Sequence, residues 1–301
     1  PDEPAPGADE PAELIRVRAF RNAGYDYVTL MPPGFGFATG EQEHCESISL
    51  NDGTVITDRQ SFEAYAWPDP DGADLGFFDR VAPHLPDGMK IVAHGPGGVE
   101  ENVISLVGYE NLCFMSADDP ELVDRVFTEV GSRLVRYYER VSAHEAVGAC
   151  ISNDDWGFKT QTLLSVRQME RWLFPWHKRI VETIHAAGKP AILHSCGNLA
   201  PVMNVIIDDL GYDGKHSYED TIMPVEEAYD AYAGRIAVLG GIDVDFVCSH
   251  PPSEVYQRSR AMLERAADRG GYALGTGNSV PAYVPDEGVF AMLRAALDLR
   301  T

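Results

Sequence analysis

Short apolar runs alternate with longer stretches of helical periodicity along most of this chain. A short run bounded by turn residues is typical of a buried strand, whereas apolar positions three or four residues apart are typical of an amphipathic helix. The predicted strands are the runs 25–30, 90–94, 111–115, 149–153, 190–194, 214–217, 236–240 and 272–275. The run 111–115 is the least regular and also fits a helix start or a loop. Eight strand–helix units predict an α/β fold in which parallel strands close into a (β/α)8 TIM barrel.

Helical periodicity predicts helices over 13–23, 120–141 and 166–187, with Pro175 kinking or splitting the last of these. Residues 31–74 interrupt the alternation. There the stretch 48–57 alternates around an Asp-Gly turn, which predicts a β-hairpin insertion overhanging one end of the barrel. Residues 1–12 are rich in Pro, Asp and Glu and predict a flexible acidic lead-in. Residues 13–301 are predicted to form a single barrel domain that carries the insertion at about 31–74, and residues 1–12 form an N-terminal extension to it.

Composition narrows the class of partner. The chain of 301 residues carries 47 acidic and 24 basic side chains, a formal net charge of −23. Such a surface repels phosphate backbones and anionic lipid, so we expect a small-molecule substrate rather than nucleic acid or a membrane. No apolar run approaches the length of a membrane span. Five widely spaced cysteines without a CxxC motif predict a reducing, cytoplasmic location.

Polar residues gather where the predicted strands end, which is where barrels of this type place their active sites. We expect Asp154, Asp155 and Glu219 to be catalytic. Residues expected to bind substrate are His94, Asp243, Thr276 and Asn278. Four of these positions also have a structural explanation: helix capping for the two aspartates, a backbone hydrogen bond for His94, and a solvated loop for Glu219.

The stretch from His194 to Asn198 follows the apolar run 190–193 directly. Side chains alternate faces along a strand, so His194 and Cys196 emerge on the same side while Ser195 points away. Imidazole nitrogen and thiolate sulfur are both favoured ligands of zinc. A buried histidine and a buried cysteine packed at a strand end explain the same pattern, so the pair alone leaves both interpretations open.

Four motifs, taken together, are more specific. They are Asp154-Asp155-x-Gly157 with Pro175 in the next helix, the run from Gly188 to Asn198, Gly240-Gly241-Ile242-Asp243, and Gly275-Thr276-Gly277-Asn278-Ser279 followed by Pro281 and Pro285. In these motifs, from about residue 88 to the C-terminus, the chain resembles the uroporphyrinogen decarboxylase superfamily. Within it, the resemblance is greatest to the corrinoid-dependent methyltransferase branch. This resemblance implies a (β/α)8 barrel with its site at the strand C-termini.

In that branch, a His-x-Cys pair and a Cys in the last glycine turn bind zinc, which assists methyl transfer to or from a corrinoid-binding protein. His194 and Cys196 match two of these ligands, but Thr276 stands where the third, a Cys, is expected. Glu219 is the preferred replacement, with Asp154 or Asp243 as alternatives, and a site without zinc is also open. The resemblance therefore implies a methyltransferase that moves a methyl group between a corrinoid protein and a small thiol or tetrahydrofolate.

Two other functions remain open. The first is a carboxy-lyase of the uroporphyrinogen decarboxylase type, in which Asp154 would stabilise a protonated pyrrole. The decarboxylase itself uses an arginine-rich segment near its start, and the three arginines at 16, 18 and 21 lack the glycine and aspartate pattern expected there. The second is a non-catalytic barrel that keeps the fold alone, since fold does not establish function.

Overall fold

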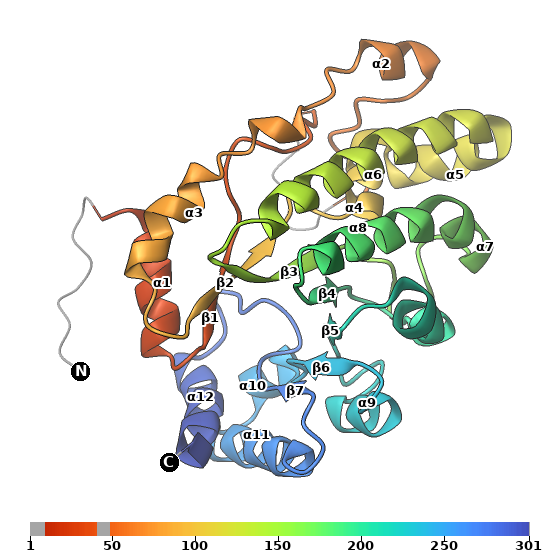
Figure 1. Ribbon diagram of the computed structural model, residues 1–301. Coiled ribbons are helices and arrows are strands. Elements are labelled where there is room, and N and C mark those ends of the chain that lie inside the picture. The colour runs from red at the N-terminus through yellow and green to blue at the C-terminus, as the bar shows by residue number, and fades with distance from the viewer. Residues whose placement is uncertain (1–9, 41–48, 301) are drawn as a thin grey trace.

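A computed structural model of the protein describes residues 10–40 and 49–300. Its centre is a curled, parallel seven-stranded sheet whose strands are neighbours in chain order (Figure 1). The strands are β1 Tyr27–Leu30, β2 Lys90–His94, β3 Val147–Asn153, β4 Ala191–His194, β5 Gly214–His216, β6 Ala237–Leu239 and β7 Tyr272–Ala273. Helical crossovers join them, which gives the α/β TIM-barrel fold expected from the sequence.

Twelve α-helices are present in the described part of the chain, together with five short helical turns. The α-helices are α1 Ala12–Asn22, α2 Arg59–Ala64, α3 Gly76–Val81, α4 Val99–Val107, α5 Tyr109–Asp118, α6 Pro120–Ser142, α7 Val166–Gln168, α8 Phe174–Ala186, α9 Val225–Tyr232, α10 Val244–Ser249, α11 Pro252–Ala266 and α12 Asp286–Arg300. The short turns are η1 Pro70–Gly72, η2 Ala82–His84, η3 Met169–Leu173, η4 Ala200–Val202 and η5 Val205–Leu210. None of the described helices combines the length and apolar character needed to cross a bilayer.

The helices predicted over 13–23 and 120–141 are confirmed. Helix α6 begins where Asp119 accepts a hydrogen bond from the backbone N–H of Leu122, with Pro120 in the first turn, where its missing N–H leaves nothing unpaired. The predicted split at Pro175 is also confirmed. A π-helical turn, η3, separates α7 from α8, and Pro175 lies in the first turn of α8.

The predicted strand at 111–115 is wrong, because these residues lie inside helix α5. Leu112 and Met115 are buried, while Phe114 between them is exposed. That three-residue spacing places the two buried side chains on one helical face. The described sheet therefore holds seven strands instead of eight, and β1 and β7 lie at its two edges.

The hairpin predicted within 31–74 is not found in the described part of that segment. Its first arm falls on residues 41–48, which lie outside the described residues. The expected second arm, at Val55 and Ile56, is not a strand, since both N–H groups donate to the carbonyl of Leu106 at the end of α4. Ile56 is fully buried there, so this part of the insertion packs against the barrel instead of pairing with itself. Of the predicted lead-in 1–12, residues 1–9 also lie outside the described range.

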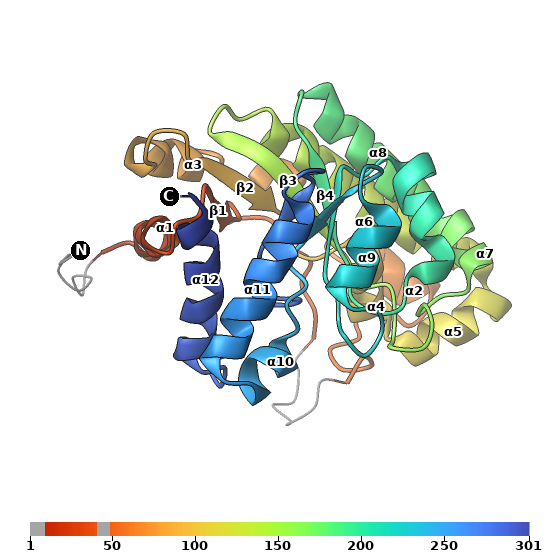
Figure 2. The ribbon, with the colours of Figure 1, turned by 90° about the horizontal axis from the view of Figure 1, so that it is seen from below.

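Two hydrophobic cores support the strands. The larger packs β1 to β4 against α4, α6 and α8, and the smaller packs β6 against α9, α11 and α12. Figure 2 shows α11 and α12 side by side, with α12 close to α1. The Arg300 guanidinium on α12 binds the Asp26 carboxylate and the carbonyl of Gly24, at 2.6 Å and 2.8 Å. The last helix is thereby fastened to the turn before the first strand.

Candidate functional site

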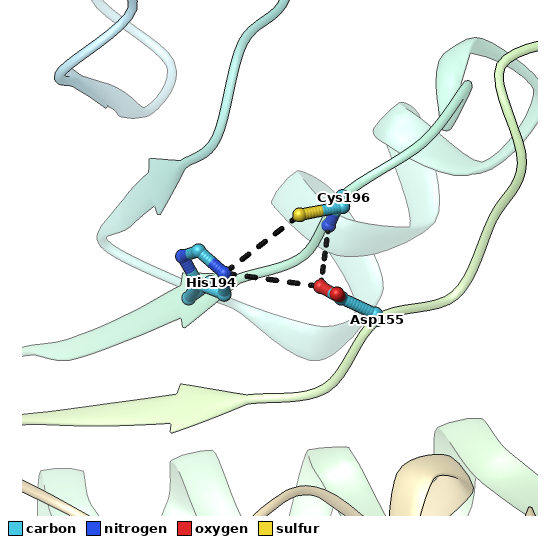
Figure 3. A group of neighbouring side chains, drawn as sticks. All are labelled: Asp155, His194 and Cys196. Atoms are coloured by element: carbon cyan, nitrogen blue, oxygen red, sulfur yellow. Dashed lines mark hydrogen bonds and ion pairs between the residues drawn. The ribbon is translucent and has the colours of Figure 1, made fainter. Parts of the chain in front are cut away.

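Three side chains with metal-binding donors meet at the ends of β3 and β4 (Figure 3). His194 is the last residue of β4, Cys196 follows two residues later, and Asp155 comes just after β3. The His194 Nε2 atom lies 3.8 Å from Cys196 Sγ and 3.8 Å from Asp155 Oδ1. All three ligand atoms lie within 4.8 Å of one another, and no other cluster of His, Cys, Asp and Glu in the described chain has such spacing.

A chain of imidazoles orients His194. Its Nδ1 lies 2.6 Å from Nδ1 of His216, whose Nε2 lies 3.1 Å from the carbonyl oxygen of Thr276. Burial lowers the pKa of His216 to about 4, so this ring is neutral. Because its Nε2–H donates to Thr276, its Nδ1 accepts from His194. The remaining lone pair of His194 is then on Nε2, facing Asp155 and Cys196.

The Cys196 sulfur is held by neighbours on two other strand ends. The Asn278 amide donates to Sγ at 3.3 Å, and the Ser217 hydroxyl lies 3.4 Å from it. The backbone N–H of Cys196 donates to Asp155 Oδ1 at 2.8 Å. Burial, and then the nearby Asp155 carboxylate, raises the pKa of the Cys196 thiol to about 12. In the protein alone this cysteine is therefore a thiol, and a metal ion would favour its thiolate form.

Ser217 adopts a backbone φ of 88°, in the left-handed region that favours glycine. Its carbonyl oxygen accepts a 2.6 Å hydrogen bond from Nζ of Lys215, a side chain only 3 % exposed. The same ammonium donates to the carbonyl of Ser195 at 3.2 Å. Lys215 thus ties the ends of β4 and β5 together and stabilises the strained residue that presents its hydroxyl to Cys196.

Asp154 points away from this cluster and is fully buried. Its carboxylate accepts from the backbone N–H groups of Glu100 and Glu101 at 2.9 Å and 2.8 Å, at the beginning of α4, and lies 2.8 Å from His177 Nε2. The positive end of the helix dipole stabilises a carboxylate in this position. Gly98 allows the close approach, because a Cβ there would lie 2.1 Å from the Asp154 side chain.

The other predicted residues lie around the cluster but do not join it. Asp243 caps α10 through the N–H of Asp245 at 2.7 Å and also accepts from the N–H of Asp220 at 2.8 Å. The ring of His94 lies 3.2 Å from the carbonyl of Gly95, and burial lowers its pKa. Glu219 lines a neighbouring pocket. Its carboxylate forms no metal-like group with His194 and Cys196.

Sequence reasoning did not single out several residues that shape this region. Lys215 and His216 lie in β5, where the sequence Gly-Lys-His-Ser is polar and gives no signal that the lysine is buried. His177, whose ring lies 2.7 Å from the Tyr212 hydroxyl, follows a tryptophan on α8 with no distinguishing spacing. Burial raises the pKa of Glu101 to about 7, and both carboxylate oxygens of Glu100 are buried without a hydrogen-bond partner.

Comparisons with known proteins identify the family. A family model described as uroporphyrinogen decarboxylase (URO-D) matches residues 93–299, well over half of the chain. The chain belongs to the URO-D family. This URO-D protein is 26% identical over 181 residues to a methylated-thiol–coenzyme M methyltransferase from Methanosarcina mazei. It is 29% identical over 132 residues to a uroporphyrinogen decarboxylase from Anaeromyxobacter dehalogenans.

These alignments are partial. The first covers 58% of this chain and 46% of the relative, and the second covers 44% and 36%. The URO-D chain therefore spans less than half the length of either relative. Among solved structures, a methyltransferase from Methanosarcina mazei superimposes with a TM-score of 0.68 at 14% identity, covering 95% of this chain and 84% of that one. At that identity the structural match shows the barrel fold, and the sequence matches show an enzyme family with methyltransferase and decarboxylase members.

Proposed function

We propose that this protein is a zinc-assisted methyltransferase, which moves a methyl group between a corrinoid-binding protein and a small thiol or tetrahydrofolate. The observation that carries the proposal is the spacing of Asp155, His194 and Cys196. In a tetrahedral zinc site with ordinary bond lengths, neighbouring ligand atoms lie about 3.3–3.6 Å apart. The two 3.8 Å separations around His194 Nε2 exceed this by only a few tenths of an ångström.

Asp155 is the best third ligand in place of the missing cysteine. Thr276 is a poor replacement, because zinc sites take Cys, His and Asp or Glu side chains rather than a neutral hydroxyl, and this hydroxyl is turned to donate to the carbonyl of Asn278. The Asp155 carboxylate, by contrast, is held toward the cluster by the N–H of Cys196. Glu219 remains the alternative third ligand, because its charge lies close enough to raise the pKa of Cys196. Three protein ligands are typical of catalytic zinc sites.

When bound, zinc would hold Cys196 as a thiolate and favour the deprotonated form of a substrate thiol. The surrounding residues prepare the ligands for this role. His216 and the carbonyl of Thr276 fix the tautomer and orientation of His194, a task that residues behind metal ligands commonly perform. Ser217 and Asn278 orient the Cys196 sulfur and moderate its charge through hydrogen bonding. These contacts place the three donors before any metal arrives.

The identity of the transferred group rests on similarity. The curated Methanosarcina mazei relative acts, by its name, on methylated thiols and coenzyme M. The similarity to decarboxylases supports a carboxy-lyase as the second candidate. A substrate with several carboxylates needs basic partners, and the pocket beside the cluster has one lysine, Lys215, whose ammonium is already bound to backbone carbonyls. The pocket therefore favours the methyltransferase.

The decisive experiment measures zinc content. Wild-type protein, purified without added chelator, is expected to carry one zinc per chain by elemental analysis. Cys196→Ser and Asp155→Asn are expected to lose most of it, while the matched carboxylate control Glu219→Gln keeps it. Full zinc in Cys196→Ser would remove the cysteine from the site, and loss in Glu219→Gln but not in Asp155→Asn would make Glu219 the third ligand.

Activity is tested separately. Methylcobalamin serves as a soluble substitute for the corrinoid protein, with a simple thiol or tetrahydrofolate as acceptor. We expect thiol- or tetrahydrofolate-dependent loss of the methyl–cobalt absorbance, and less of it in Cys196→Ser. Turnover of a uroporphyrinogen without any demethylation of methylcobalamin would replace the methyltransferase by the carboxy-lyase.

A further inference from the structure

The N-terminus of helix α4 is capped by a residue of another element. Its N-cap residue is Gly98, which has no side chain to accept from the unpaired N–H groups of the first turn. The Asp154 carboxylate, just beyond β3, takes this role and accepts from the N–H groups of Glu100 and Glu101. The end of β3 therefore lies directly against the first turn of α4.

The contact also runs in the opposite direction, through the side chain of Glu101. Its Oε2 atom accepts from the backbone N–H of Gly98 at 2.9 Å and from the side-chain amide of Asn153 at 3.4 Å. Burial raises the pKa of Glu101 to about 7, and the backbone N–H of Asp155 is among the groups that lower it. Because an N–H group lowers a carboxyl pKa by hydrogen bonding to the carboxylate, Glu101 binds the backbone of Asp155.

Asp155 lies in a short run whose backbone N–H groups are bound one after another. The N–H before it donates to the carbonyl of His194 at 2.8 Å, and the N–H after it donates to the Ser195 hydroxyl at 3.1 Å. Both acceptors are at the end of β4. The N–H of Asp155, between them, interacts with Glu101. The peptide from which the Asp155 side chain emerges is thus held by α4.

The Asp155 side chain is partly exposed and reaches across to β4. Its Oδ1 atom accepts from the N–H of Cys196 at 2.8 Å and lies 3.8 Å from His194 Nε2. Figure 3 shows the carboxylate pointing from the end of β3 toward both of these residues. Metal ligands keep such directions through the groups behind them, so the fixed peptide helps to aim this carboxylate.

Capping alone does not explain a carboxylate at position 101. Glutamine completes a capping box as well as glutamate does. Here the side chain is half-buried beside the carboxylates of Asp154 and Asp155, which disfavours a third negative charge. A carboxylate, however, has two acceptor oxygens and can serve Gly98 and Asp155 together, whereas an amide has one.

We infer that Glu101 is a positioning residue for Asp155: it holds the backbone of this aspartate from α4, so that the carboxylate faces the cluster. The inference rests on the proposed function, in which Asp155 is the third metal ligand. It gives α4 a direct link to the metal site through Glu101, whereas Asp154 holds the helix itself.

The first test needs no metal. Amide hydrogen exchange of the chelator-treated full chain is followed by NMR at Cys196, whose N–H is bound to Asp155. We expect this amide to exchange about fivefold faster or more in Glu101→Ala, because its acceptor is no longer held in place. Gln168→Ala is the matched control, since Gln168 makes the same capping bond, to the N–H of Ser165, at the beginning of α7. It should leave the Cys196 amide unchanged.

The second test uses Co²⁺ alone, titrated into the same proteins and followed by its thiolate charge-transfer and visible d–d absorbance. Residues behind metal ligands commonly change metal affinity by about 10–100-fold, so Glu101→Ala should bind Co²⁺ at least about tenfold more weakly, with altered d–d bands. Gln168→Ala should match the wild type. Wild-type exchange at Cys196 or wild-type Co²⁺ affinity in Glu101→Ala would overturn the inference. A wild type that binds no Co²⁺ contradicts the proposed function, and the exchange test then decides the positioning alone.

Glu101→Gln covers the case in which Glu101→Ala does not fold. It keeps one acceptor oxygen for the cap and removes a charge from beside Asp154, so its unfolding free energy should equal or exceed that of the wild type. It has no second oxygen for Asp155, so exchange at Cys196 should still be faster. Full stability together with wild-type exchange at Cys196 would overturn the inference, because capping would then be the whole role of this side chain.

Discussion

The two adjacent aspartates of this site are expected to have opposite roles, which makes Asp154→Ala the most informative substitution. Its carboxylate is fully buried and bonds to two backbone N–H groups and to His177, at 2.8–2.9 Å. Removing it leaves three buried donors unpaired, each costing about 1–3 kcal/mol. With partial relaxation, the loss in unfolding free energy should be about 3–5 kcal/mol. That is a large share of the roughly 5–15 kcal/mol typical of folded proteins.

The measurement is urea unfolding of chelator-treated protein, followed by tryptophan fluorescence and circular dichroism, so that metal binding does not contribute to stability. Asp155→Ala is the matched control. Its side chain is 42% exposed, and we expect it to cost less than about 1 kcal/mol while weakening zinc binding. The pair separates a carboxylate that holds the backbone from one that faces the cluster.

The reasoning fails if Asp154→Ala loses less than about 1 kcal/mol, or no more than Asp155→Ala does. A stable Asp154→Ala protein that has lost methyl transfer would also contradict it, since Asp154 would then act on substrate, as the sequence pattern predicts. Destabilisation with preserved zinc binding in the folded fraction is the result that the structure predicts.

Three further predictions follow from single positions. Ser217→Gly should relieve the strain of the φ of 88° and raise the unfolding free energy by about 1 kcal/mol. Ser217→Ala should not raise it, because alanine keeps the Cβ. Equal melting temperatures for the two variants would show that the position is not strained. Gly98→Ala should destabilise strongly, because the new Cβ would lie 2.1 Å from Asp154, while Gly36→Ala, whose nearest neighbour is 3.8 Å away, should be tolerated in thermal melts. Burial raises the pKa of Cys150 from 9.0 to about 12, so the native thiol keeps its proton after the unfolded one has lost it. Stability should therefore fall as pH rises from 9, by about 2 kcal/mol at pH 10.5, and pH-dependent urea unfolding of Cys150→Ala should lack this component.

Hydrophobic patterns with periods of two and 3.6 residues were sufficient to predict most of the fold. Strands such as 90–94 and 190–194 have apolar cores bounded by turn residues, and the helix 120–141 has an uninterrupted apolar stripe. The run 111–115 has the same local composition as a strand. It is helical in the structure because Gly108, at a φ of 80°, ends α4 and α5 begins at the next residue. The composition of the run does not reveal this. Val55 and Ile56 likewise pair with α4, a partner some 50 positions away that no local pattern reveals.

The candidate site was likewise predictable only where its geometry is local. Alternation along a strand was enough to place His194 and Cys196 together, because that geometry is local. It could not say which of Asp154 and Asp155 turns toward them, since this depends on the N-terminus of α4 accepting the first. Nor could it show that Lys215 lies beneath the cluster, because a buried lysine is recognised only by the carbonyls around its ammonium.

The short edge strand β7 has a consequence for motion in the site. Strand β7 has two residues, and beyond it a single isolated bridge joins Ile242 and Thr276. Backbone held by so few hydrogen bonds opens at a lower free energy than the seven-residue strand β3. A local opening of 274–279 would release the carbonyl from His216 and the amide of Asn278 from the sulfur in one event.

Such an opening would leave His194 and Asp155 in place on β4 and β3 while uncovering Cys196 from one side. The metal-ligand candidates on β3 and β4 would thus stay together while the segment 274–279 opens without unfolding of the barrel. Amide hydrogen exchange faster at 274–279 than at 147–153 is the expected signature, and equal protection of the two segments would contradict it.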